Sequence, residues 1–323
     1  MTTVPHSPDT EIETHFVFDA HDAPVDHGLF GPDSISWKVW SHPAALVGGI
    51  RSFQAEILTS PEAAAAVVDF GTYKDDPVGR LQRTMQYFLT IVFGDTATVD
   101  KANLRLGRMH KRITGHTPAT GRAYSGVDPL LMLGTHLLTW HSVWVCYEAL
   151  VGKQSKEDEE RYFLESERAA RALGLDQLSA EEYRALAAER GYDITAIENF
   201  EGAAPATHAD YSAFLSTTEP AWTVTGQTRA VIDALMKPDG ASSLREALLY
   251  SFYPLISNAA AATLPRKMRA IAGIPTSSAW EVRSIALGKL AMSALSIPQT
   301  RIRFENEVSA RGYALVRKAM AQA

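Results

Sequence analysis

The chain has 323 residues, of which 46% are hydrophobic, and a net charge of −6. This length can bury a large core in one or two domains, and the acidic balance does not indicate a nucleic-acid partner. The single cysteine, Cys146, excludes a disulfide framework within the chain, which is typical of proteins in a reducing compartment.

The first 26 residues carry six acidic residues, three prolines and no lysine or arginine. This composition predicts a disordered acidic tail over 1–26, without the pattern of a secretory signal peptide. We therefore expect one folded domain over 27–323 and a cytoplasmic location.

The remaining chain shows helical periodicity almost throughout, and no segment alternates regularly enough to predict a strand. Ser60 before Pro61 is typical of a helix start, Gly94 of a helix end, and Ser179 with Glu182 of a capping box. In chain order, the predicted helices span residues 41–58 (weakened at Gly48–Gly49), 60–71, 78–94, 97–115, 129–150, 156–174, a short segment after 179, 226–237, 243–262 (kinked at Pro254), 277–295 and 304–320, with broken helix and loop over 196–225.

This pattern predicts an all-α fold: a single large multi-helix domain, with the helix density of a globin rather than the seam of a coiled coil. The longest apolar stretch, 129–151, is long enough to cross a bilayer, which takes about 20 residues. It contains His136, His141 and Glu148 and has no flanking basic cluster. We therefore predict a buried core helix and no membrane span.

One histidine falls beside the apolar stripe of the 97–115 helix. His110 borders Met109, and this stripe comprises Val99, Ala102, Leu106, Met109 and Ile113. A buried imidazole needs a partner for at least one ring nitrogen. His110 is therefore either a core histidine bonded to a backbone carbonyl or a metal or haem ligand. Residues 101–122 carry six basic residues and no acidic one, which suits two haem propionates.

The 78–94 helix places Arg80 and Thr84 four residues apart on one face, with Arg83 close by. They are either a surface arginine and a threonine bonded within its own helix, or a pocket lining for an anionic or oxygen-bearing ligand.

In the central helix, His136 and His141 point about 140° apart and cannot form a facing metal pair. His136 has a core role or a pocket role, and Cys146 is expected to pack in the core.

The chain lacks a zinc-protease motif, a helical Glu-x-x-His, a nucleotide-binding loop, a Gly-x-Ser-x-Gly elbow and a Cys-x-x-Cys-His motif.

Three segments carry a family resemblance: DPVGRLQRTMQYFLTIVFGD, RMHKRITG and YSGVDPLLMLGTHLLTW. With them, the chain resembles the family of rubber oxygenase (latex clearing protein) and MpaB-type oxygenases, from about Gly28 to Lys318. The catalytic domain of that family binds haem b.

The resemblance implies that His110 is the proximal ligand of the haem iron, that Arg80 and Thr84 are the polar pair beside the haem, and that His136 matches a histidine of the long central helix. Arg83 falls where latex clearing protein has a lysine able to cap the iron, and a guanidinium has no lone pair for this. Ser60 stands where many relatives have a histidine. The base glutamate of the rubber enzymes has no assigned counterpart, and these departures argue against rubber as the substrate.

The leading hypothesis is a haem b-dependent oxygenase, an oxidoreductase that uses dioxygen or a peroxide to cleave, epoxidise or hydroxylate a lipophilic small molecule. Its predicted residues are His110 as metal ligand, Arg80, Arg83 and Thr84 in catalysis, and Arg80, Thr84, Arg108, Arg112 and His136 around the cofactor. Two alternatives remain: a non-catalytic haem carrier or sensor on the same fold, and a haem-free helical binding protein. The sequence does not determine the substrate or the oligomeric state.

Overall fold

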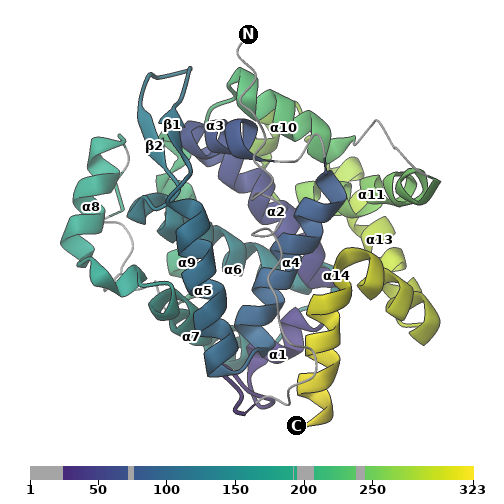
Figure 1. Cartoon of the computed structure of the whole chain (residues 1–323). Helices are drawn as coiled ribbons and strands as arrows, with labels where there is room; N and C mark the ends of the chain where they lie inside the picture. Colours follow the sequence, from purple (N-terminus) through teal and green to yellow (C-terminus); the bar gives the residue numbers. More distant parts are fainter. Residues whose placement is uncertain (1–24, 72–75, 192, 195–206, 238–243) are drawn as a thin grey trace.

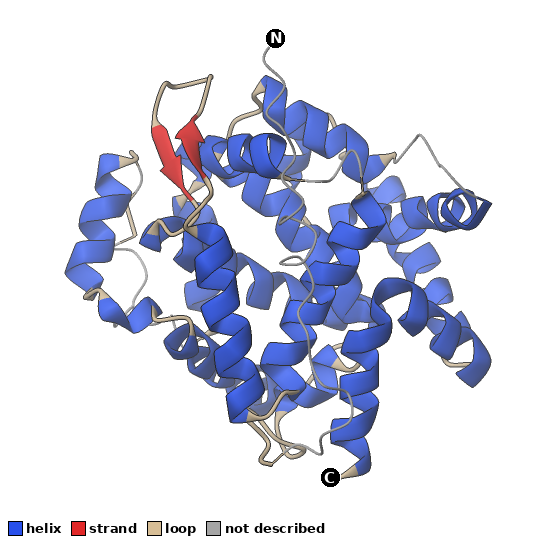
Figure 2. Ribbon diagram, viewed as in Figure 1, coloured by secondary structure: helices blue, strands red, loops and turns tan. Residues whose placement is uncertain are grey.

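The computed structural model describes residues 25–71, 76–191, 193–194, 207–237 and 244–323. Figures 1 and 2 show an all-α arrangement with one small hairpin. The α-helices are α1 Ile35–Trp40, α2 Ala44–Thr59, α3 Pro61–Phe70, α4 Pro77–Phe93, α5 Thr96–His110, α6 Pro129–Val151, α7 Lys156–Ala172, α8 Ala180–Glu189, α9 His208–Thr217, α10 Gly226–Met236, α11 Leu244–Ala262, α12 Arg266–Ala272, α13 Ser278–Ala294 and α14 Pro298–Ala321. The strands are β1 Thr114–His116 and β2 Ala123–Ser125, and 3-10 turns occupy Leu175–Gln177 and Glu219–Ala221.

Side-chain caps set several helix starts where the sequence predicts them. The Ser60 hydroxyl accepts the Ala63 amide at 3.0 Å and begins α3, with Pro61 in the first turn. Ser179 and Glu182 form the predicted capping box of α8. These local contacts satisfy amide groups that have no partner inside the helix, which is why the motifs are readable from sequence.

The centre of the domain is the packing of α2 against α6. Gly48 permits this contact, because a Cβ atom there would lie 2.4 Å from the Cα of Val143. The helix expected to weaken at Gly48–Gly49 is in fact continuous from Ala44 to Thr59. Tertiary packing outweighs the low helix propensity of glycine here. The central helix α6 is buried over most of its length, as predicted.

The end of α5 differs from the prediction. The helix stops at His110 rather than at Gly115, and the following residues form the antiparallel pair β1–β2, with Gly115 opposite Tyr124. Strands of three residues are too short to show alternation, which is why no strand is predicted here. The returning chain passes close to the helix end: a Cβ atom at Gly126 would lie 2.7 Å from the carbonyl oxygen of His110.

The C-terminal helices also depart from the prediction. Helix α14 begins at Pro298, not at residue 304, and its backbone is extended at Ser309 (φ −168°). It packs on α4 at Gly312, where a Cβ atom would lie 2.8 Å from Leu89. The short helices α1 and α12 are not predicted, because both are shorter than the windows in which periodicity is visible.

Of the predicted acidic tail, residues 1–24 lie outside the described residues. Residues 25 and 26 are held against the start of α5: Asp26 accepts the Thr96 amide at 2.8 Å, and the Val25 amide donates to Asp95. Of the expected loop over 196–225, residues 196–206 are not described, and the remainder contains α9 and a 3-10 turn. No helix among the described residues is long and apolar enough to cross a membrane.

Candidate functional site

A large cavity of about 1500 Å³ lies inside the helical domain. Its walls are mainly apolar, and it exceeds the range of roughly 300–1,000 Å³ that is typical of small-molecule pockets. In Figure 1, α5 lies on one side of α4, and α11, α13 and α14 lie on the other. We name the two ends of the cavity by residues in its lining. The histidine end includes Glu56, Arg80, Thr84, Arg105, His110 and His136; the apolar end includes Phe252, Ile256, Leu287, Leu290, Phe304 and Val308.

His110 is the last residue of α5 and lines the cavity. Burial lowers the pKa of its imidazole, and a hydrogen bond to the Gly126 backbone opposes this shift. Burial thus favours the neutral form of the ring. Its Nδ1 atom is buried and has no hydrogen-bond partner among the described residues. A neutral imidazole with an unpaired nitrogen is chemically able to bind a metal.

His136 lines the same cavity from α6. Its side chain is 5% exposed, and burial lowers the pKa of the ring to about 3. Its Nε2 atom is also buried without a hydrogen-bond partner in the described part of the chain. Both cavity histidines thus carry a nitrogen that a ligand could satisfy.

His141 belongs to a different environment, in agreement with the helical geometry that separates it from His136. Its Nδ1 lies 3.4 Å from the guanidinium of Arg51, and its Nε2 lies 3.3 Å from the hydroxyl of Ser212. Arg51 also donates to Ser142 at 2.6 Å. The two histidines therefore do not share a site.

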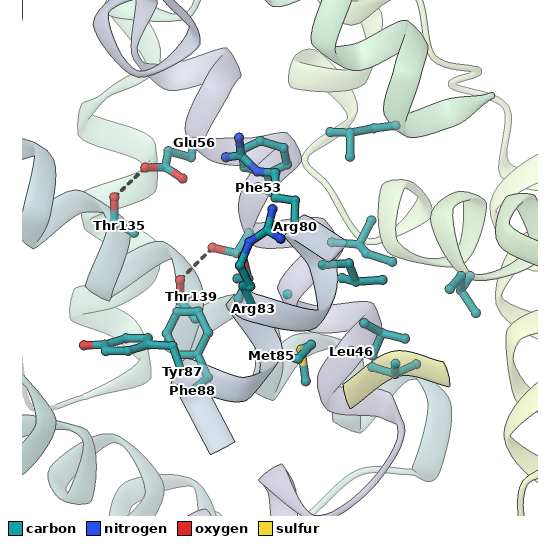
Figure 3. Close-up of a pocket in the computed structure, with 18 of the residues that line it drawn as sticks. Leu46, Phe53, Glu56, Arg80, Arg83, Met85, Tyr87, Phe88, Thr135 and Thr139 are labelled. Atoms are coloured by element: carbon teal, nitrogen blue, oxygen red, sulfur yellow. Dashed lines mark hydrogen bonds between the residues drawn. The ribbon is translucent and has the colours of Figure 1, made fainter. Parts of the chain in front are cut away.

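Arg80 and Thr84 line the cavity from one face of α4, as their spacing predicts. The Arg80 guanidinium carbon lies 5.0 Å from the centre of the Phe53 ring, a cation–π contact that Figure 3 shows. The chain after α3 lies directly against this group, because a Cβ atom at Gly71 would lie 2.2 Å from the Arg80 guanidinium.

Arg83 also lines the cavity, but it has an ion-pair partner. Its guanidinium lies 2.9 Å from the Asp76 carboxylate, and its side chain is 22% exposed. The same carboxylate accepts the Gly79 amide at 2.8 Å and caps α4. Arg83 is thus anchored to the start of its own helix.

Sequence reasoning missed Glu56, a carboxyl group in the wall of the histidine end. The Thr135 hydroxyl donates to it at 2.5 Å (Figure 3). Burial raises the pKa of Glu56, whereas the Thr135 hydrogen bond and the charge of Arg80 act in the opposite direction. A recognisable signal existed: Glu56 is the one acidic residue of the predicted helix over 41–58, in which Arg51 is the one lysine or arginine.

The basic residues predicted for the propionates are placed differently from the prediction. Within the described residues, Arg108 and Arg112 are exposed and do not line the cavity, whereas the half-buried Arg105 does. Arg105 precedes Arg108 by three residues, and the face of α5 that meets the cavity is slightly rotated from the predicted stripe. Met109, assigned to that stripe, lines the cavity and is 43% exposed.

No group of three or more His, Cys, Asp or Glu side chains that could hold a metal ion occurs among the described residues. Cys146 is buried in α6 and lies 3.5 Å from the Thr263 hydroxyl, which agrees with a packing role.

The geometry is that of a helical domain with an internal, mostly apolar cavity. Residues 37–296 match the model of the family described as the catalytic domain of ER-bound oxygenase mpaB/B′ and rubber oxygenase. The chain therefore belongs to this family, as the resemblance implied, and its fold is all-α. Membership supports oxygenase activity in general, which requires a substrate and an oxygen donor. Neither the curated proteins nor the solved structures gave a match to the chain.

Proposed function

We propose that this protein is a haem b-dependent oxygenase that acts on a lipophilic small molecule. The observation that carries the proposal is the cavity itself, whose mainly apolar lining includes His110, Arg80 and Thr84. A haem requires an axial nitrogen, an apolar slot and polar groups near its edge.

The residues present fit such a group. The unpaired, buried Nδ1 of His110 and Nε2 of His136 are polar atoms that the protein alone leaves unsatisfied. The porphyrin brings four nitrogen ligands of its own, so one histidine is sufficient to hold the iron. His110 would hold it, with His136 as the other cavity histidine. When bound, the haem would supply the activation of dioxygen or a peroxide.

The chain itself provides charge, hydrogen bonding and exclusion of water. The Arg80 and Arg105 guanidinium groups place positive charge at the histidine end, which favours the carboxylates of a propionate-bearing ligand. The Thr84 hydroxyl can donate to an oxygen-bearing ligand. Glu56 is half-buried, and this burial raises the pKa of its carboxyl group, which can exchange a proton with a substrate in the cavity.

The volume of the cavity favours an enzyme over a carrier. At about 1500 Å³, it exceeds what a single ligand normally occupies, so that cofactor and substrate can be accommodated together. The apolar end favours a hydrocarbon-rich substrate. Oxidative cleavage, epoxidation and hydroxylation are all compatible with this arrangement.

The test is the visible spectrum of the purified protein, together with iron analysis and extraction of the pigment. We expect a Soret band and about one b-type haem per chain. His110→Ala should lose haem, whereas His141→Ala, outside the cavity, should retain it; circular dichroism of both variants checks the fold. A colourless, iron-free protein that does not take up added hemin would contradict the proposal.

A further inference from the structure

The apolar end of the cavity reaches the molecular surface between α11, α13 and α14. Several residues are both part of its lining and exposed to solvent: Phe252 and Leu290, each 67% exposed, and Ala294, Thr300 and Arg303. We call these five residues the mouth. Exposed phenylalanine and leucine side chains at the rim of an apolar cavity are typical of an entrance for a hydrophobic ligand.

The mouth carries one cationic group, Arg303. It forms no hydrogen bond or ion pair with any described residue, in contrast to Arg301, whose guanidinium donates to Glu305 at 2.8 Å. Thr300 lies three residues earlier in α14, on the same side of the helix. A cation and a hydroxyl therefore stand at the edge of an apolar wall.

The stretch of chain that carries the α13 and α14 residues of the mouth is basic, although the whole chain is acidic. Residues 282–304 carry four basic residues and no acidic one. Besides Arg301 and Arg303 these are Arg283 and Lys289, both exposed on α13 and without ion-pair partners among the described residues. One carboxylate, Glu307, lines the cavity a turn further along α14, but it is half-buried whereas Arg303 is exposed.

We propose that the mouth binds the head group of a long-chain carboxylic acid, and that Arg303 is the residue that recognises it. A guanidinium binds a carboxylate through two parallel hydrogen bonds, while the chain extends along Leu287, Ile256 and Phe304 toward the histidine end. The substrate class of the proposed oxygenase is then an anionic amphiphile rather than a neutral hydrocarbon. The oxidation of such a chain rests on the proposed function, but its binding does not.

The experiment is equilibrium dialysis of the purified protein with radiolabelled oleate and, in parallel, oleyl alcohol, which has the same chain and no charge. We expect the wild type to bind oleate about 10-fold more tightly than the alcohol, which corresponds to about 1.4 kcal/mol. Arg303→Gln should remove this preference and leave the alcohol affinity unchanged, which also shows that the variant is folded. Lys289→Gln, which removes a nearby cation outside the cavity lining, should retain the preference.

Equal affinities of the wild type for oleate and oleyl alcohol would overturn the inference, and so would a preference that survives in Arg303→Gln. Flotation with phosphatidylglycerol vesicles tests a different occupant: if Arg303→Gln loses vesicle binding but keeps the oleate preference, the mouth docks on a membrane and the inference fails. Haem is measured on the same samples. An oleate preference in haem-free protein supports the inference and contradicts the proposed function. Haem-loaded protein without the preference contradicts the inference and supports the proposed function.

Discussion

The Arg83 guanidinium lies 2.9 Å from the carboxylate of Asp76, the residue that caps the helix on which Arg83 stands. The sequence predicts Arg83 as a donor to a bound ligand, and the structure shows that this donor already has a partner at the wall of the cavity. If Arg83 contacts a ligand, its guanidinium is shared between that ligand and Asp76, which holds the guanidinium in place.

Replacing Arg83 separates its structural contribution from its functional one. Asp76 is 50% exposed, so the ion pair contributes at most about 1 kcal/mol. We expect Arg83→Ala to change the free energy of unfolding by less than this amount while lowering oxygenase turnover. Asp76→Asn, which keeps Arg83 but weakens its anchor, should have a smaller effect on turnover. Urea denaturation and product formation check the two quantities, and unchanged turnover in Arg83→Ala would remove Arg83 from the proposed catalytic set.

The absence of a lone pair on Arg83 has a spectroscopic consequence. In the proposed haem complex, with His110 as the iron ligand and no lysine at position 83, the iron should be open to small probes. Azide or imidazole should shift the Soret band at millimolar concentration. His136→Phe should give the same shift, because His136 is not expected to bind the iron. A wild-type spectrum that is unmoved by azide, and becomes responsive in His136→Phe, would instead identify His136 as a second ligand.

Glu56 should control the acid limb of the pH–rate profile. Burial raises its pKa, so the charged form is lost as pH falls through a value above that of an ordinary glutamate. If the carboxylate accepts a proton from substrate, turnover falls on the same limb, and Glu56→Gln abolishes that limb together with most of the activity. Thr135→Val removes a hydrogen bond that lowers the pKa of Glu56. The acid limb of the pH–rate profile of this variant should therefore move to higher pH. A profile identical to wild type in Thr135→Val would show that Glu56 does not set it.

Buried histidines should make the protein less stable as pH falls below about 6.5. Burial and the charges of Arg51 and His208 hold the pKa of His141 well below its usual value. Between the folded and unfolded pKa values, the unfolded chain binds a proton that the folded chain does not, so the free energy of unfolding decreases with falling pH, by at most about 1.4 kcal/mol per unit for each such group. Urea unfolding at pH 7.5, 6.5 and 5.5 measures this slope. His141→Asn should reduce the slope, and an unaltered slope would contradict the assignment.

Two adjacent glycines in α2 should respond in opposite directions to the same substitution. Gly48→Ala places a Cβ atom 2.4 Å from the Cα of Val143 and should destabilise the protein by about 1–3 kcal/mol through overpacking of α2 on α6. At Gly49 the nearest atom to such a Cβ is the Met85 sulfur, 3.9 Å away. Gly49→Ala should therefore stabilise the helix by about 0.5–1 kcal/mol. Thermal unfolding of Gly48→Ala and Gly49→Ala, each compared with the wild type, separates the effect of the packing contact from that of helix propensity.

The candidate site was predictable where it depends on one helix. Arg80 and Thr84 share a face of α4 because four residues make about one helical turn, and His110 lies beside an apolar stripe for the same reason. Glu56 and Arg105 were not predicted as cavity residues. Their positions depend on how α2, α5 and α6 pack together, and helical periodicity carries no information about the rotation of one helix against another.

The sequence by itself determined the helical class, most helix boundaries, the caps at Ser60 and Ser179, and membership of the oxygenase family, because these features depend on local hydrogen bonds, apolar periodicity and motif order. Only the tertiary structure decided that one cavity joins His110 and His136 to an apolar mouth at Arg303. The physical reason is that a cavity is the space left by helices far apart in the chain. Its shape follows from contacts such as Gly48 with Val143, which no local pattern encodes.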